Sequence, residues 1–458
     1  MKKEFNHSDV FLIPIVEPYD LIYAPLQGVR AVVNRAESRR IAEFLSGEAR
    51  DGKTDTLCEY LSEPPHILHV VSEGPITRPL FLGLIPTRDC NLSCRYCNFT
   101  TSEKHKVIMS LDLVMRSIDA YLGLLSQNGN SRADLHFFGG EPFYAKTVVV
   151  SAVEYALFKA LKMGIDVYLE ATTNGVYDSE LCHWIADSFD TIILSLDGPK
   201  EIQDKQRPSL SGASTFETVH RNAKIFSEGS AELVLRSCVT GQTTAQMKEI
   251  ARWMTQEYLP AAICFEPLTS TSRAQMAGLF PPEPWDFARE FCKILEMLAP
   301  TGIDVICSTV DIYKVQNTPC ALGKDALIVA ADGSVYACYL LPDEWKQRGL
   351  NLKIGSVRED GFEFDMGAVE GVRKLANQKR TICTGCLCLY HCAGGCRVHH
   401  EINHRFYDDL CIYTRIITIY KLLMDLGQND LANFWLSNHD LVKKTTLQPT
   451  DRLEEQEL

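Results

Sequence analysis

Three cysteines near residue 90 have a spacing that could hold a metal. Cys90, Cys94 and Cys97 occur in the segment PTRDCNLSCRYCNF, with the pattern CxxxCxxC, directly after the apolar run LFLGLI. A structural zinc site takes four protein ligands, and a four-iron cluster normally takes four thiolates. Three thiols with no fourth close in sequence therefore predict a cluster with one position left open to a reacting ligand. Three unrelated core thiols are the alternative, because free cysteine is often buried.

Alternating strand and helix patterns follow this triad and must position it. Between residues 81 and 299, short apolar runs alternate with amphipathic stretches at residues 110–127, 145–164 and 243–259. Six such units favour a parallel sheet covered by helices, either an incomplete six-stranded barrel or a doubly wound sheet. In both architectures the active residues gather at the C-terminal ends of the strands. The predicted strands are LFLGLI, DLHFFGG, IDVYLEATTNG, DTIILSLDG, AELVLRSCVT and AAICFEPL.

Three turn motifs at the ends of these strands could join the triad. They read FFGGEP, TTNG and SLDGP. Glycine permits close backbone approach to a ligand, and a glutamate offers an acceptor to a cationic group. Each motif alone fits an ordinary turn equally well. The candidate residues are Gly139, Gly140, Glu141 and Pro142 in the first motif, Asn174 in the second and Ser195 in the third.

The composition indicates a globular protein and excludes several classes. The 458 residues are 46% hydrophobic and 23% charged, which suits two or three domains. A net charge of −13 without a long basic cluster argues against nucleic acid as a partner. Because we find no apolar run of eighteen residues and no secretory leader, we expect a cytoplasmic protein without a membrane span. In a reducing compartment, 17 cysteines indicate metal binding or thiol chemistry rather than disulfides.

The joint order of CxxxCxxC, GGEP, TNG and SLDGP resembles the radical S-adenosylmethionine (SAM) enzymes over roughly residues 81–300. This resemblance implies a 4Fe–4S cluster on the triad, with the amino and carboxylate groups of SAM on the open iron. It also implies that a 5′-deoxyadenosyl radical abstracts a hydrogen atom from a substrate. Arginine could grip the SAM carboxylate bidentately, although an internal ion pair is the alternative for both candidate arginines. The residues implied to contact SAM are Tyr96 beside the adenine, Gly139, Gly140, Glu141 and Pro142 at the amino group, and Asn174, Ser195, Arg207 and Arg236.

A second field of cysteines follows the predicted barrel. Seven of these thiols have an order that resembles the SPASM extension of radical SAM enzymes, which implies two auxiliary 4Fe–4S clusters. Structural zinc is the alternative, and the histidines of RVHHEINH are expected beside the clusters or at the surface. The first cluster lacks an obvious fourth ligand, which could be an upstream thiol, a non-cysteine group or an open position. The resemblance assigns Cys320, Cys338 and Cys396 to the first cluster, with Cys307 as the favoured fourth ligand, and Cys383, Cys386, Cys392 and Cys411 to the second.

SPASM enzymes mostly modify peptides or proteins, and two branches are candidates. Anaerobic sulfatase maturases, which oxidise Cys or Ser to formylglycine, carry an aspartate directly after the cysteine that matches Cys338, whereas this chain has Tyr339. The other branch forms thioether, carbon–carbon or ether crosslinks in ribosomally made precursor peptides. The segment YAPLQGVRAVVN resembles the opening of such enzymes and favours this branch. Glu266, at the end of the sixth strand, is a candidate catalytic residue that faces the substrate, or else a carboxylate at the core edge.

The expected α/β organisation is a partial (βα)6 TIM-like barrel between two smaller parts. The N-terminal domain is winged-helix-like and could capture a leader peptide by strand addition, or could simply cap the barrel. The expected partners are a precursor peptide and a flavodoxin or ferredoxin as electron donor. A three-cluster electron carrier is the alternative from another class, but it gives no reason for GGEP, TNG or the βα scaffold. The predicted parts are residues 1–75, the barrel at 76–300, the SPASM domain at 301–425, and a helix with a solvated tail at 426–458.

Overall fold

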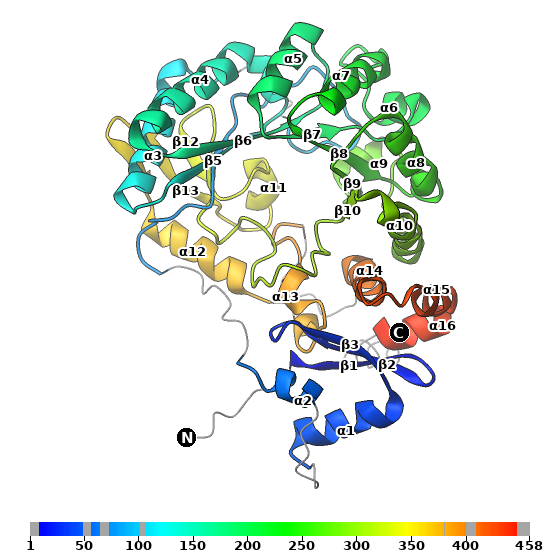
Figure 1. Cartoon of the computed structure of the whole chain (residues 1–458). Helices are drawn as coiled ribbons and strands as arrows, with labels where there is room; N and C mark the ends of the chain where they lie inside the picture. Colours follow the sequence, from blue (N-terminus) through cyan, green and yellow to red (C-terminus); the bar gives the residue numbers. More distant parts are fainter. Residues whose placement is uncertain are drawn as a thin grey trace.

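The computed structural model describes residues 9–48, 56–64, 73–100, 107–379, 381–399 and 409–446. A large sheet surrounded by helices occupies one end of the molecule, and a smaller sheet with the C-terminal helices beside it occupies the other (Figure 1). The predicted solvated tail lies outside the described residues.

The smaller sheet is formed by the N-terminal part of the chain. Its elements are β1 (Phe11–Val16), β2 (Tyr19–Ala24), β3 (Val29–Asn34), α1 (Arg35–Ser46) and α2 (Thr56–Leu61). The three strands are antiparallel and lie in the order β1-β2-β3. Ile22 packs on Ile41 of α1 and Leu61 of α2, whereas Leu21 on the opposite face belongs to the main core. This sheet is therefore buried on both faces.

The six predicted strands form the parallel centre of the larger sheet. They are β4 (Leu82–Leu84), β5 (Arg132–Phe137), β6 (Asp166–Thr173), β7 (Thr191–Ser195), β8 (Glu232–Val239) and β9 (Ala262–Pro267). Strands that are consecutive in sequence are neighbours in the sheet. Along β5, Ala133, Leu135 and Phe137 are at most 1% exposed, while Asp134 and His136 between them are partly exposed. The predicted parallel α/β barrel is confirmed.

Helices cover the outer face of this sheet (Figure 1). They are α3 (Leu111–Gln127), α4 (Lys146–Met163), α5 (Ser179–Ser188), α6 (Lys200–Gln206), α7 (Phe216–Glu228), α8 (Met247–Glu257), α9 (Ser272–Met276) and α10 (Pro284–Leu298). Ser110 and Asp178 cap α3 and α5 by accepting hydrogen bonds from backbone N–H groups in the first turn. Such groups have no partner inside the helix, so the two caps mark where these helices begin.

Two strands from the cysteine-rich part extend the parallel sheet at its edges. β10 (Asp304–Ile306) pairs in parallel with β9, and β11 (Leu327–Val329) pairs in parallel with β4. From β11 the sheet continues through antiparallel β12 (Ser334–Tyr336), β13 (Lys353–Arg358) and β14 (Gly361–Phe364). The barrel thus has more parallel strands than the six predicted. The added strands are three residues long, which is too short for a periodic pattern to identify them.

Helices complete the C-terminal part. They are α11 (Pro342–Lys346), α12 (Met366–Asn377), α13 (Leu389–Cys392), α14 (Asp409–Asp425), α15 (Asn429–Ser437) and α16 (His439–Thr446). α14 packs against α10 of the barrel, and α16 packs against β1. Gly427 has φ +69° between α14 and α15 and turns the chain there. α14 therefore connects the barrel to the N-terminal sheet.

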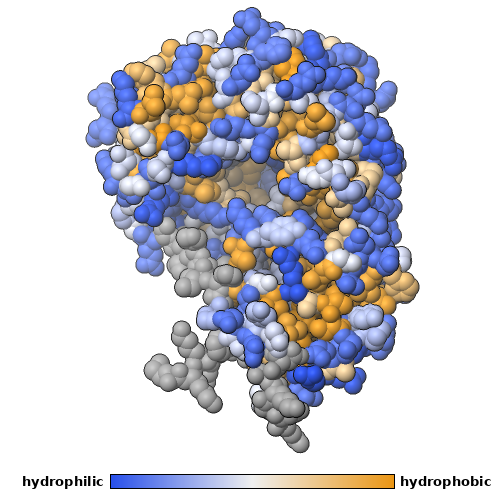
Figure 2. Space-filling view, viewed as in Figure 1, coloured by the Kyte–Doolittle hydropathy of each residue, from blue (hydrophilic) through white to orange (hydrophobic). Residues whose placement is uncertain are grey.

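The face of the molecule seen in Figure 2 is hollowed near its centre, with apolar surface inside the hollow. In the described ranges, none of the helices is long and apolar enough to cross a membrane.

Candidate active site

A cavity of about 330 Å³ lies at the C-terminal ends of the parallel strands. It collects residues from the loop after β4 and from the ends of β5 to β9. Among the residues predicted to contact SAM, Pro142 does not line it; this proline is buried and begins the short 3-10 turn before α4. The predicted site residues that line the cavity are Cys90, Cys94, Tyr96, Cys97, Gly139, Gly140, Glu141, Asn174, Ser195, Arg207, Arg236 and Glu266.

The three thiols of the triad occupy one irregular loop of this cavity. Cys94 is buried, and Cys90 and Cys97 are partly exposed. The backbone N–H of Leu92 donates to Cys90 Sγ at 3.4 Å, and that of Phe99 donates to Cys97 Sγ at 3.4 Å. Backbone donors to sulfur are a common feature of iron–sulfur sites, where they tune the cluster.

Two glycines allow the triad loop to pack against the end of β5. A Cβ atom on Gly140 would lie 2.2 Å from the carbonyl oxygen of Asp89 and 2.4 Å from that of Arg88. On Gly139, where φ is +148°, it would lie 2.4 Å from the carbonyl oxygen of Thr87. Carbon and oxygen atoms do not approach so closely, so only glycine fits at these two positions.

The Glu141 carboxylate accepts hydrogen bonds from groups of the protein itself. Its Oε1 accepts hydrogen bonds from Thr173 Oγ1 at 2.8 Å and the backbone N–H of Phe143 at 3.2 Å, and its Oε2 accepts from the backbone N–H of Asn174 at 2.7 Å. Burial raises the pKa of this carboxyl to about 7, against the lowering effect of the three donors. We expected Glu141 to offer an acceptor to a cationic ligand. In the structure its carboxylate ties the end of β5 to the end of β6, and its contact with a ligand stays a prediction.

Asn174 connects the end of β6 to the triad loop. Its Nδ2 donates to Asn91 Oδ1 at 2.8 Å and lies 3.5 Å from Cys90 Sγ, while its Oδ1 accepts from the backbone N–H of Val176 at 2.8 Å. The side chain is 4% exposed. Its described contacts orient a residue next to a cluster ligand, and the contact with SAM stays a prediction.

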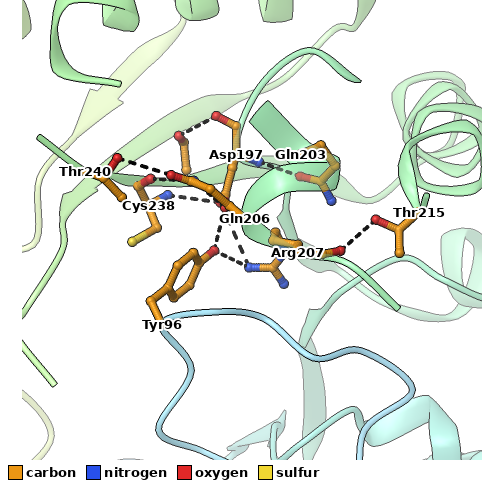
Figure 3. A network of polar contacts seen from close by, with 9 residues as sticks. Tyr96, Asp197, Gln203, Gln206, Arg207, Thr215, Cys238 and Thr240 are labelled. Atoms are coloured by element: carbon orange, nitrogen blue, oxygen red, sulfur yellow. Dashed lines mark hydrogen bonds and ion pairs between the residues drawn. The ribbon is translucent and has the colours of Figure 1, made fainter. Parts of the chain in front are cut away.

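Tyr96 belongs to a buried polar network that Figure 3 shows. Its hydroxyl donates to Asp197 Oδ2 at 2.6 Å and accepts from Arg207 Nη1 at 2.7 Å. Asp197 also accepts from Gln206 Nε2 at 2.8 Å and from the backbone N–H of Cys238 at 3.2 Å, and its side chain has no exposed surface. Asp197 was not a predicted site residue, although it is the only acid of SLDGP. The network fixes the Tyr96 ring at the wall of the cavity.

Arg236 and Glu266 face the cavity from the ends of β8 and β9. Glu266 accepts from the backbone N–H of Ser308 at 2.9 Å and from Ser308 Oγ at 3.0 Å. Across the described ranges, the Arg236 guanidinium makes no hydrogen bond or ion pair, and the cavity gives solvent access to it. Burial lowers its pKa, but nearby Cys264 and Glu266 outweigh burial and raise it overall. A cation in this position is available to a carboxylate ligand.

Besides Asp197, two titratable residues that were not predicted there line the cavity. His399, from the run RVHHEINH, is the part of the C-terminal region that lines it, and the following residues 400–408 lie outside the described ranges. Cys238, at the end of β8, also lines it. Neither position has a local sequence signal, because only the tertiary packing of the C-terminal region brings His399 to the barrel.

Arg88 connects the triad loop to the position after Cys338. Its Nη1 donates to the carbonyl oxygen of Tyr339 at 2.6 Å, and burial lowers the pKa of this arginine to about 10. The Tyr339 ring packs on Phe138, a residue of the cavity wall, with centroids 4.7 Å apart. The Tyr339 hydroxyl is buried and has no hydrogen-bond partner within the described parts of the chain. An uncharged ring therefore occupies this position.

The C-terminal cysteines fall into two groups. In the first, burial and then the thiols of Cys320 and Cys396 raise the pKa of Cys338 to about 12, so the three lie close together. A second small cavity contains the other group. Its lining includes Cys383, Cys386, Cys392 and Cys411, together with Cys388, Thr414 and Arg415.

Cys307 lies beside Thr309, with 3.7 Å between its Sγ and Thr309 Oγ1. Burial raises its pKa, followed by the effects of Glu266 and, more weakly, Cys392. Its assignment as a cluster ligand stays a prediction.

The spacing of these thiols bears on the zinc alternative. Among the described residues, no three His, Cys, Asp or Glu side chains are close enough to hold a single metal ion. Zinc would require sulfurs about 2.3 Å from one ion. A four-iron cluster places each thiolate on a different iron, so wider spacing suits it.

Comparison with known proteins agrees with this geometry. Residues 84–254 match the family model of the Radical SAM superfamily. A cysteine-type anaerobic sulfatase-maturating enzyme from Clostridium perfringens is 22% identical over 338 residues, which cover 70% of this chain and 89% of the relative.

Two solved structures share the fold. The structure of anSMEcpe with bound AdoMet and Kp18Cys peptide has a TM-score of 0.60 at 21% identity, covering 79% of this chain and 100% of that one. Streptococcus suis SuiB bound to S-adenosylmethionine has a TM-score of 0.50 at 13% identity, covering 85% and 94%. The matched domain and the motif residues around one cavity lead to one conclusion: this chain carries a radical SAM domain over residues 84–254 and is an enzyme.

Proposed function

We propose that this enzyme matures a ribosomally made precursor peptide by abstracting a side-chain hydrogen atom and forming a thioether, carbon–carbon or ether crosslink. The observation that carries the proposal over sulfatase maturation is Tyr339. Where the sulfatase maturases carry an aspartate, this chain has an aromatic ring packed on Phe138 at the cavity wall.

The cavity suits SAM bound to a cluster on the triad. Three thiols line it, Arg236 offers a cation to a carboxylate, and Tyr96 offers an aromatic wall. When bound, the cluster and SAM supply a 5′-deoxyadenosyl radical, which is chemistry that belongs to the cofactor. The protein holds the cofactor and separates the reaction from water. Gly140 and Asn174 serve this task indirectly, because both fix the triad loop.

A peptide is the substrate class best supported. The related fold of anSMEcpe binds the Kp18Cys peptide together with AdoMet. Here, β3 pairs only with β2 among the described residues, so its outer edge has backbone groups available for a further strand. An extended leader peptide would bind such an edge through main-chain hydrogen bonds, with side-chain pockets providing register. Glu266 and His399 line the cavity, and we propose that they face the modified segment.

The two C-terminal cysteine groups are proposed to hold two auxiliary 4Fe–4S clusters. Their thiols gather as two separate sets, and the second set lines a cavity of its own. Forming a crosslink removes two hydrogen atoms from the peptide. The 5′-deoxyadenosyl radical accounts for one of them, so the reaction needs a further electron acceptor. A flavodoxin or ferredoxin is the proposed donor to the triad cluster.

Sulfatase-type maturation is the second candidate, because the curated relative from Clostridium perfringens has that activity and covers most of this chain. It would convert a Cys or Ser of a protein to formylglycine. Asp343 and Glu344 of α11 would then be the acids nearest in sequence to the position of the missing aspartate.

Intact-mass measurement tests the proposal. The enzyme is co-expressed anaerobically with each short peptide encoded beside its gene, and the Cys94→Ala variant provides the matched control. A peptide that loses two hydrogen atoms per modified site, only with the parent enzyme, supports crosslinking.

The same spectra separate the alternatives. Unchanged masses for all neighbouring peptides, together with formylglycine in a sulfatase-motif peptide, would replace the proposal with sulfatase-type maturation. Reductive cleavage of SAM that survives in Cys94→Ala would contradict the assignment of the triad itself.

A further inference from the structure

A buried arginine lies against the second cysteine group. Arg415 lies on α14, four residues after Cys411, and is 1% exposed. It lines the second cavity beside the cysteine thiols, and its Nη1 donates to the carbonyl oxygen of Thr446 at 3.0 Å. The guanidinium is thus anchored on one side by the end of α16 and directed on the other toward the thiols.

Two more cations lie around the same thiols. Arg397 is 4% exposed, and its Nη2 donates to the carbonyl oxygen of Ala393 at 2.7 Å. A Cβ atom on Gly394 would lie 3.0 Å from Arg397 Nη1 and 3.3 Å from Cys383 Sγ, so this guanidinium and this thiol are neighbours. Lys379 donates to the same carbonyl oxygen at 3.4 Å. The residues that line the second cavity include no Asp or Glu.

We propose that Arg415 is a positioning residue that raises the reduction potential of a 4Fe–4S cluster held by the second cysteine group, so that this cluster accepts an electron more readily. The inference rests on the auxiliary clusters of the proposed function. The positive charges of Arg397 and Lys379 act in the same direction.

The physical reason is charge. Four thiolates give an iron–sulfur cluster a negative charge, and one-electron reduction adds another. Potentials of such clusters depend on net charge and on hydrogen bonds to the sulfurs, and Arg415 supplies a buried positive charge at the wall of the cavity. Because burial removes water that would screen the charge, its effect on the reduced state is stronger than at a surface.

Redox titration followed by EPR tests the inference on the whole chain. The background carries Ala at Cys90, Cys94 and Cys97, so that all signals come from the C-terminal clusters. The EPR signal that is lost in Cys386→Ala is assigned to the cluster of the second cysteine group. Arg415→Met, Arg415→Lys and Lys421→Met are then compared, with iron counted in each protein. Lys421 lies on the same helix and stacks on Tyr313 away from the cavity.

For Arg415→Met we expect at least a tenfold lower ratio of reduced to oxidised cluster at the parent's midpoint, which is 59 mV for one electron. Arg415→Lys should shift less, because it keeps the charge, and Lys421→Met should not shift. Equal potentials in all variants with full iron would overturn the inference. Should Arg415→Met lose iron, Arg415→Gln is titrated in its place under the same criterion. A background protein without iron would instead refute the auxiliary clusters of the proposed function.

Discussion

Replacing Gly140 with alanine should displace the triad loop. The added Cβ would lie 2.2 Å from the Asp89 carbonyl oxygen, and ordinary contact begins at 3.4 Å, so one of the two backbones must move by about 1.2 Å. Gly140 does not have a positive φ, so the effect is steric rather than conformational. Misplacement of catalytic groups by about 1 Å can cost roughly 10²-fold in rate.

We therefore expect Gly140→Ala to cleave SAM roughly 10²-fold more slowly than the parent, or to lose the triad cluster. The assay counts iron per chain after anaerobic reconstitution and follows 5′-deoxyadenosine with time. Gly123→Ala is the matched control: Gly123 is helical, with nothing within 4 Å of its added Cβ. That change should be neutral or stabilising by about 0.5–1 kcal/mol. Full iron and a cleavage rate within about twofold of the parent would refute the argument that packing of the GGEP glycines positions the triad.

Three further substitutions test other parts of the site. Arg236→Gln should weaken SAM binding by about ten- to a hundredfold, since a hydrogen bond to a charged group contributes about 1.5–3 kcal/mol; an unchanged Kd in equilibrium dialysis would remove Arg236 from the cofactor site. Asp197→Asn should lower the thermal midpoint, because breaking a buried charge pair with Arg207 costs about 3–5 kcal/mol; a parent-like melting curve would contradict this. Burial raises the pKa of Glu170 to about 7, so the folded chain keeps a proton there that the unfolded chain has lost above about pH 4.5, and stability falls as pH rises through this window. The melting temperature of Glu170→Gln should fall less than that of the parent between about pH 5 and about pH 8. An equal fall in both proteins would show that Glu170 is not the responsible group.

The barrel and the set of residues that line the cavity could be predicted, because both are marked by patterns within short stretches of the sequence. Apolar runs separated by amphipathic stretches identified the six central strands. Parallel strands share one C-terminal edge, so motifs at successive strand ends had to meet, and the triad, Gly140 and Asn174 do line one cavity.

The direction of individual side chains could not be predicted in the same way. Glu141 follows a strand end as expected, but the three protein donors to its carboxylate could not be predicted from the sequence. Asp197 has no local feature that distinguishes it from a turn acid; its importance depends on Arg207 and on Tyr96, which is 101 residues away in sequence. His399 reaches the cavity only because the C-terminal region folds back onto the barrel.

These side-chain directions indicate that the motifs at the strand ends hold the triad loop in place. The triad loop is irregular, so its position depends on contacts with other strand ends. The backbone N–H of Glu141 donates to the Asp89 carbonyl oxygen at 2.9 Å, and Asn174 donates to Asn91. On the other side, the backbone N–H of Arg95 donates to the carbonyl oxygen of Gln206 at 2.9 Å.

Two strand-end turns and the C-terminal end of α6 thus hold the three-thiol loop. Ordering a flexible loop costs about 1–2 kcal/mol per residue, and here contacts within the protein already oppose that cost. It follows that a substitution in the turns after β5 and β6 or at the C-terminal end of α6 should reach the cluster through the loop, even where the replaced side chain never contacts iron or SAM.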